Sequence, residues 1–247
     1  MGLVRGVAAK SGESKSDVFI QIDVDLDHAL TLDLSPPDVT SRGPDRVQAT
    51  ASIQVGSEGF APLPNGYVSS DLPLSGPLSF VGVPTLSGSL LGTSYIVTAR
   101  AVTGQAASTP RSVVGLVSAQ DTSQPLVLDR FVQVPKLTVP APNATWDGRG
   151  LAATRAAGGS DIDLYVYDVE SAGGLVAWKI IAPGSAGSFS LPDLRAVGPD
   201  LGLSPGPLTI TVNAARIDNF VYGALRYRDI AQRGWTAYAT DVFYASY

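Results

Sequence analysis

Apolar and polar residues alternate along much of the chain, and this alternation is typical of a strand with one buried face. The first clear run begins at Asp17 and places Asp23, Asp25 and Asp27 on its polar face. It continues to Leu34, where two prolines end it. The start of the chain therefore predicts a half-buried strand that follows a flexible lead-in over residues 1–16.

Further short alternating runs follow, each bounded by Gly, Pro, Ser or Asn, which are turn-forming residues. They cover residues 47–53, 95–102, 110–117, 126–132, 134–142, 151–154, 162–167, 176–181, 188–191, 208–212 and 237–247. Residues 61–78 are dense in Pro, Gly, Asn and Ser, so we expect a long loop there with one edge strand. Short strands at this spacing predict an all-β fold of antiparallel β-sandwiches.

One segment, residues 219–232, carries a helical pattern instead. Asp218 could serve as its N-cap and Gly234 as the residue that ends it. The apolar positions follow a spacing of four, three and four: Phe220, Ala224, Tyr227 and Ala231. We therefore expect one short helix near 219–232 in a chain that is otherwise β.

Composition agrees with a β protein and excludes several chemistries. The chain has 247 residues, of which 45% are hydrophobic and 16% charged, and it contains few of the helix-favouring residues Glu and Lys. It has no Cys, which excludes disulfides and thiolate sites, and its one histidine, His28, excludes a multi-His metal site. A net charge of −5 argues against nucleic acid as a partner, and no apolar stretch is long enough for a transmembrane segment.

Residues 118–125 are polar and end in a proline, so we place the linker at 119–126. On this basis we expect a first β-sandwich over 17–118 and a second over 127–247. Both parts contain an x-Pro-x-Leu sequence followed by Gly and an alternating strand that ends in Ala. This internal repeat favours two tandem, related sandwiches over one large barrel.

Residues 90–118 carry a specific local pattern. A leucine at position 90, a Gly-Thr turn, Tyr95 at the start of a strand and a Ser/Pro-containing loop precede a last strand. This pattern resembles the closing hairpin of a fibronectin type III domain, and with 127–247 it resembles fibronectin type III-like or immunoglobulin-like domains of bacterial surface or secreted proteins. The resemblance implies that Tyr95 buries its ring and returns its hydroxyl to a backbone group upstream.

Residues 158–168, with an Asp-x-Asp-Leu-Tyr sequence, resemble a strand of bacterial pre-peptidase C-terminal domains. That resemblance implies that Asp161 and Asp163 could bind calcium, and calcium is the one candidate cofactor of the chain. The alternative is a structural strand without metal. The carboxylates at positions 23, 25 and 27 fail the EF-hand pattern, because His28 replaces the required glycine and Leu34 the required glutamate.

Four aromatic residues are candidates for binding a ligand. Trp146 and Trp235 stand beside Gly and charged residues, where exposed rings could stack on sugars, and Tyr165 and Tyr167 share a strand face. The alternative is that these rings belong to the core or to cross-strand pairs. A cluster of Arg226, Arg228 and Arg233 among aromatics indicates a solvated face rather than a nucleic-acid surface.

From these features we expect a non-catalytic binding or structural module that engages a protein or a surface polysaccharide. A Cys-free, low-charge β chain fits a secreted or cell-envelope location, extracellular or periplasmic, with a leader removed. The alternative function is a structural component of a phage tail or surface appendage. A carbohydrate-active enzyme is a weaker alternative because no pair of carboxylates stands out and Glu is scarce.

Overall fold

The computed structural model describes residue 26 and residues 28–55, 59–118, 123–172, 177–193, 196–198 and 203–247. The fold class is confirmed: in these residues the regular structure is almost entirely β, in antiparallel sheets with one parallel pair. The carboxylates Asp23, Asp25 and Asp27 lie outside the described residues. None of the helical segments in the described ranges has the length and apolarity to cross a membrane.

Contacts between Cα atoms divide the chain into two units. The first contains the described residues up to Leu34 together with Val47–Arg100 and Gly115–Asp129, and the second contains Ser35–Arg46, Ala101–Val114 and Arg130–Tyr247. Contact grouping does not measure which parts of a chain fold alone. The expected sandwich boundaries at 17–118, 119–126 and 127–247 therefore stay a prediction, which limited proteolysis can test.

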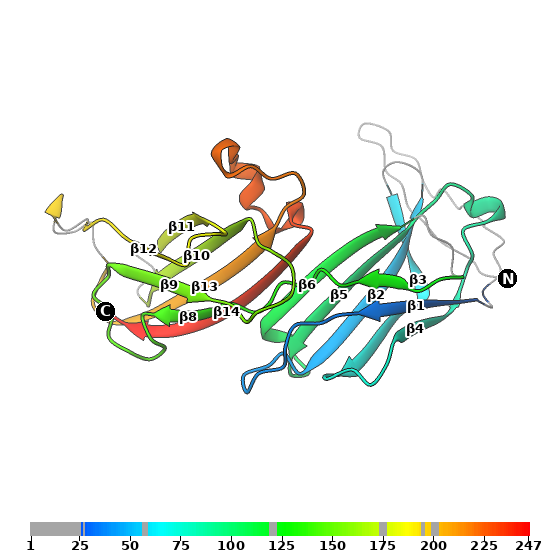
Figure 1. Cartoon of the computed structure of the whole chain (residues 1–247), viewed down its shortest axis with the longest axis horizontal. Helices are drawn as coiled ribbons and strands as arrows, with labels where there is room; N and C mark the ends of the chain where they lie inside the picture. The colour runs from blue at the N-terminus through cyan, green and yellow to red at the C-terminus, as the bar shows by residue number, and fades with distance from the viewer. Residues whose placement is uncertain are drawn as a thin grey trace, which may run out of the picture. The chain divides into compact units, whose positions relative to one another are not determined.

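Two sheets build the first unit (Figure 1). One has the order β4-β1-β7, in which β1 is antiparallel to β4 and parallel to β7. The other has the order β6-β5-β2-β3, in which residues 101–103 of β5 and 108–114 of β6 group with the second unit. Their bounds are β1 (His28–Leu34), β2 (Arg46–Val55), β3 (Gly59–Asp71), β4 (Leu78–Val83), β5 (Tyr95–Thr103), β6 (Ser108–Ser118) and β7 (Leu126–Leu128), with a 3-10 turn η1 (Gly88–Leu90).

The core of this unit is formed by the alternating apolar positions that the sequence pattern identifies. Leu30, Leu32 and Phe80 come from the first sheet, and Val47 and Val97 come from the second. Each of these side chains is at most 1% exposed. Burying such a residue contributes about 1.5–3 kcal/mol, so the alternation is the main source of stability for these strands.

The second unit is also built from two sheets, and Figure 1 shows β8 and β9 lying across the sheet that contains β13 and β14. The larger sheet has the order β11-β10-β13-β14, and β14 also pairs with residues 111–114 of β6. The smaller has the order β12-β9-β8. The bounds are β8 (Lys136–Val139), β9 (Gly150–Thr154), β10 (Leu164–Ser171), β11 (Ala177–Pro183), β12 (Ser188–Ser190), β13 (Pro207–Arg216) and β14 (Ala237–Ser246).

The expected helix near 219–232 is wrong. The segment forms three 3-10 turns, η3 (Tyr222–Ala224), η4 (Tyr227–Ile230) and η5 (Gln232–Gly234). The backbone is extended at Arg226 and Ala231, between the turns. Side chains form hydrogen bonds with the backbone of this segment. The Asp229 carboxylate accepts the Arg226 N–H at 2.8 Å, and Trp235 Nε1 donates to the Asp229 carbonyl at 2.8 Å. Local hydrogen bonds of this kind compete with helical ones.

Tyr95 confirms the expectation drawn from the hairpin pattern. Its side chain is fully buried at the start of β5, and its hydroxyl donates to the backbone carbonyl of Pro84, which precedes it by eleven residues. The ring thus fills the core, while the hydroxyl fixes the segment that leads from β4 into β5.

Substitutions at Tyr95 should separate these two contributions in urea melts of the full chain. Tyr95→Phe removes the buried hydrogen bond and should cost about 1–2 kcal/mol of the free energy of unfolding. Tyr95→Ala removes the ring as well and should cost about 3–5 kcal/mol. The matched control is Tyr244, which is 61% exposed, where both substitutions should stay within about 0.5 kcal/mol. Equal effects at the two tyrosines would contradict the assignment.

Candidate functional site

The two candidate tryptophans lie in different surroundings. Trp146 precedes β9 and is only 4% exposed, and its Nε1 donates to the Gly150 carbonyl at 2.7 Å. The expected exposure of Trp146 is therefore wrong, because the indole completes a local turn inside the core. Trp235 is half-buried and packs edge-on against Tyr238, with ring centroids 5.5 Å apart.

Tyr165 and Tyr167 lie side by side on β10, with ring centroids 5.7 Å apart, and both are buried. Tyr167 also contacts Phe189 of β12 edge-on at 5.3 Å, so the pair packs between the two sheets of the unit. Desolvation raises the pKa of both hydroxyls, and for Tyr165 the Arg155 guanidinium opposes the rise. Buried rings do not offer a stacking face to solvent, and the role of these four aromatics in binding stays a prediction.

The two candidate calcium ligands have different partners. Asp161 is exposed, whereas the Asp163 carboxylate accepts the backbone N–H of Ile217 at 2.8 Å and so anchors the end of β13. In the described part of the chain, no group of three or more acidic or histidine side chains is placed to hold a metal ion. The structure therefore gives Asp163 a structural partner, and calcium binding at this pair stays a prediction.

Thermal melts with and without calcium test this pair. We expect calcium to leave the melting temperature unchanged, whereas Asp163→Ala should cost about 1–3 kcal/mol because the Ile217 N–H loses its acceptor. Asp161→Ala is the matched control and should be nearly neutral. A saturable rise in melting temperature with calcium, abolished by the two substitutions together, would instead establish a metal site.

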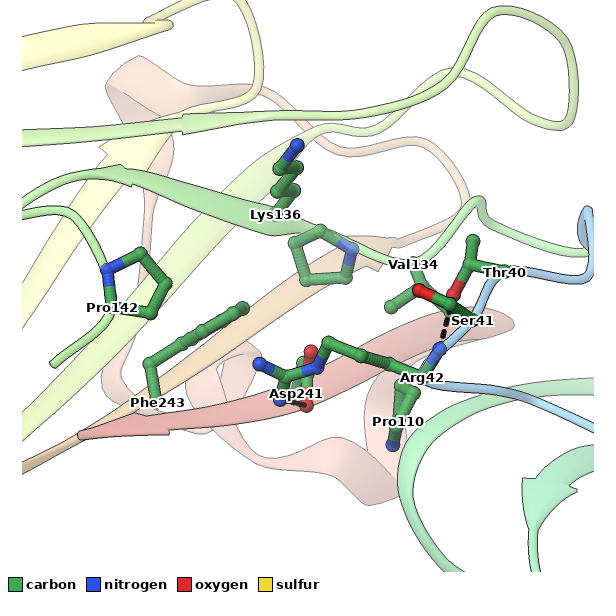
Figure 2. A pocket seen from close by; sticks show the side chains of 10 residues that line it. Thr40, Ser41, Arg42, Pro110, Val134, Lys136, Pro142, Asp241 and Phe243 are labelled. Carbon is green, nitrogen blue, oxygen red and sulfur yellow. Dashed lines mark hydrogen bonds and ion pairs between the residues drawn. The ribbon is translucent and has the colours of Figure 1, made fainter.

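A cavity of about 280 Å³ lies in the second unit (Figure 2). Its lining combines a buried aromatic ring, a buried carboxylate, three prolines and two cationic side chains. The lining residues are Thr40, Ser41, Arg42, Pro110, Val134, Pro135, Lys136, Pro142, Asp241 and Phe243. They come from the segment after β1, from β6, from the start of β8 and its flanks, and from β14.

An ion pair forms the centre of this cavity. Arg42 Nη2 lies 3.2 Å from Asp241 Oδ1 and donates also to the Val242 carbonyl at 3.2 Å. The guanidinium carbon lies 5.0 Å from the centroid of the Phe243 ring, a cation–π distance. The Asp241 side chain is 5% exposed and that of Arg42 52%, so the pair joins a buried anion to a cation that faces solvent.

The pair stands where a strand ladder ends. β14 pairs with β6 from Ala237 to Thr240, and the next β6 residue, Pro110, has no N–H to donate. Val242 is the next residue of β14 whose backbone groups face the β6 edge. Its N–H donates to Asp241 Oδ1 at 2.8 Å, and its carbonyl accepts from Arg42. Asp241 and Arg42 thus replace the missing strand.

Local motifs do not reveal this site, because Arg42 and Asp241 are 199 residues apart in the chain. One signal does point to it. In the alternation of β14, the core-facing positions are Ala237, Ala239, Asp241, Phe243 and Ala245, so a charged residue occupies an apolar phase. A buried charge needs a partner, and this position could have been singled out on that ground.

No family model matches the sequence, and no curated protein matches it. Among solved structures, the chain is similar to a two-fibronectin-type-III-domain segment from chicken tenascin, with 12% sequence identity and a TM-score of 0.24. The similarity covers 78% of this chain and 87% of that one. The topology described above comes from the strand pairings alone.

Burial raises the pKa of Asp241, and the Val242 N–H and the Arg42 guanidinium oppose that rise. A raised pKa in the folded state means that the folded protein binds the proton more readily than the unfolded chain does. The stabilisation from this group is therefore complete below the unfolded pKa of about 4 and is lost as the pH rises through the folded value.

Urea melts at several pH values test this direction. Relative to Asp241→Asn, which keeps an acceptor oxygen but does not ionise, the wild-type protein should lose free energy of unfolding between about pH 4 and pH 7. The same substitution at the exposed Asp161 serves as the control for general charge effects. A wild-type protein that gains stability over this range relative to Asp241→Asn would contradict the raised pKa.

Proposed function

We propose that this chain is a non-catalytic binding module and that the cavity around Arg42 is its binding site. The observation that supports the proposal is the hydrogen bonding and burial of Asp241, the one carboxylate among the lining residues. Asp241 accepts from both Val242 and Arg42, and its burial excludes most of the solvent. A general acid or base must instead reach the substrate proton. The residues of this cavity are therefore suited to holding a ligand rather than to acid–base chemistry on it.

The shape and lining of the cavity support the same proposal. Ligand sites are typically concave and mostly apolar, with a few polar groups that fix orientation. Here Phe243, Pro135 and Val134 provide apolar surface, while Arg42 and Ser41 provide polar groups at the rim. We propose a protein or a surface glycan as the ligand and a secreted or cell-envelope location.

Blocking the cavity tests the proposal. Ser41 is exposed at the rim, so Ser41→Trp should fill the opening without disturbing the core. The matched control is Ser185→Trp, at an exposed turn between β11 and β12 of the same unit. A screen of glycans and acidic peptides against the wild-type protein should find binding that weakens about tenfold or more in Ser41→Trp and remains in Ser185→Trp.

Two results would count against the proposal. One is binding that is equal in both tryptophan variants, or no binding at all in the screen, since the cavity would then not be the site. The other is chemical change of the bound ligand, detected by mass spectrometry after incubation with the wild-type protein but not with Ser41→Trp. That change would assign a reaction to the cavity.

A further inference from the structure

The charged side-chain groups left over in the cavity are mostly donors. Of the Arg42 guanidinium, Nη2 is occupied by Asp241 and Val242, and neither Nε nor Nη1 has a partner among the described residues. Lys136 is exposed and makes no ion pair with any described residue. Both donors to the Asp241 carboxylate reach Oδ1, so Oδ2 is its one oxygen without a hydrogen bond from a described residue.

The local charge of the cavity is opposite in sign to that of the chain. Arg42 and Lys136 supply two positive charges against the one negative charge of Asp241, whereas the chain carries a net charge of −5. Charges farther away than about 8 Å are largely screened at physiological salt, so an incoming group responds chiefly to this local excess. The cavity therefore favours an anion.

The geometry of Arg42 suits a carboxylate. Asp241 and the Val242 carbonyl hold Nη2 of the guanidinium, and the Phe243 ring lies 5.0 Å from its central carbon, so the planar group is held in one orientation before a ligand arrives. Figure 2 shows the guanidinium lying between the Asp241 carboxylate and the Phe243 ring. Each pair of parallel N–H groups on a guanidinium includes Nη2, which is engaged by Asp241 and Val242. The free Nε–H and Nη1–H groups can therefore each donate one charge-assisted bond to a carboxylate oxygen.

We infer that the cavity takes the carboxylate of an acidic peptide segment on a partner protein, an inference that rests on the proposed binding function. A carboxylate only accepts hydrogen bonds, which matches the free donors of Arg42 and Lys136. Sugar hydroxyls also need acceptors, and the side-chain acceptors left in the lining are the Ser41 hydroxyl and Oδ2 of Asp241, whose side chain is only 5% exposed. The apolar wall formed by Pro135, Pro142 and Phe243 accommodates the rest of the peptide.

Two pairs of short peptides test the inference with the full chain. Acetyl-Leu-Glu-amide is compared with acetyl-Leu-Gln-amide, which removes only the side-chain charge. Acetyl-Ala-Leu with a free carboxylate is compared with its amide, which removes the charge of the chain end. We expect the charged member of at least one pair to bind about tenfold or more tightly than the neutral one and to weaken with salt. The pair that responds identifies the source of the carboxylate.

Variants locate the binding group. Arg42→Gln should weaken binding of the charged peptide about tenfold, and Lys136→Gln should weaken it about twofold to fivefold. Arg42→Gln leaves the buried Asp241 carboxylate without its cation and could therefore destabilise the fold. Lys136→Gln is the second variant, because Lys136 is exposed and its loss should not unfold the protein. Lys179→Gln, at an exposed lysine of β11, is the matched control and should bind as the wild type does.

The outcomes separate this inference from the proposed function. Binding of a neutral peptide or glycan that Ser41→Trp abolishes, with no preference for the charged member of either pair, would overturn the inference and keep the binding site. Preference for a uronic acid disaccharide over both charged peptides would replace the protein partner with an acidic glycan. Charged-peptide binding that both glutamine variants retain would place the site elsewhere, and the absence of any binding would overturn inference and function together.

Discussion

The second unit depends on how the free edge of β14 is completed. This strand continues for six residues beyond its last pairing with β6, so its outward-facing backbone groups need other partners. Arg42 and Asp241 satisfy both backbone groups of Val242, and the backbone of residues 143–146 satisfies the Tyr244 carbonyl and both backbone groups of Ser246. An exposed edge with unpaired groups would invite another strand, and these contacts close it.

That solution also creates the chemistry of the cavity. Satisfying the Val242 N–H requires an acceptor in a buried position, and Asp241 provides it with a charge that must then be balanced. Arg42 balances that charge with part of its guanidinium and keeps the remaining N–H groups for solvent or for a ligand. The structural role of the pair and the proposed recognition of a carboxylate thus use different atoms of one arginine.

The sequence predicts the all-β class because alternation with period two reports directly which residues a sheet buries, as at Leu30, Leu32 and Val97. It predicts the Tyr95 hydrogen bond because the hairpin pattern is local. It underestimates β3, whose thirteen residues include prolines and few buried side chains, since an edge strand needs neither a complete ladder nor a buried face. The expected helix fails because side-chain hydrogen bonds to the backbone break the segment into 3-10 turns.

The candidate site shows a different limit. Alternation identifies the two faces of β10 but does not say that both are covered, which is why Tyr165 and Tyr167 were candidates for binding although they lie in the core. Arg42 meets Asp241 only through tertiary structure, so no spacing rule brings the two together. Asp241 is a charged residue at a position of β14 where the alternation expects an apolar one. Such an exception predicts a buried charge that needs a partner, and it can be found from the sequence.

The most direct measurement is an NMR titration of the full chain with acetyl-Leu-Glu-amide, following the side-chain Nε–Hε resonance of Arg42 and the backbone amide of Val242. The account predicts that both resonances shift saturably with one dissociation constant, and that acetyl-Leu-Gln-amide at the same concentrations leaves them unmoved. Saturable shifts elsewhere with Arg42 and Val242 unchanged would contradict the account, as would equal shifts with the two peptides.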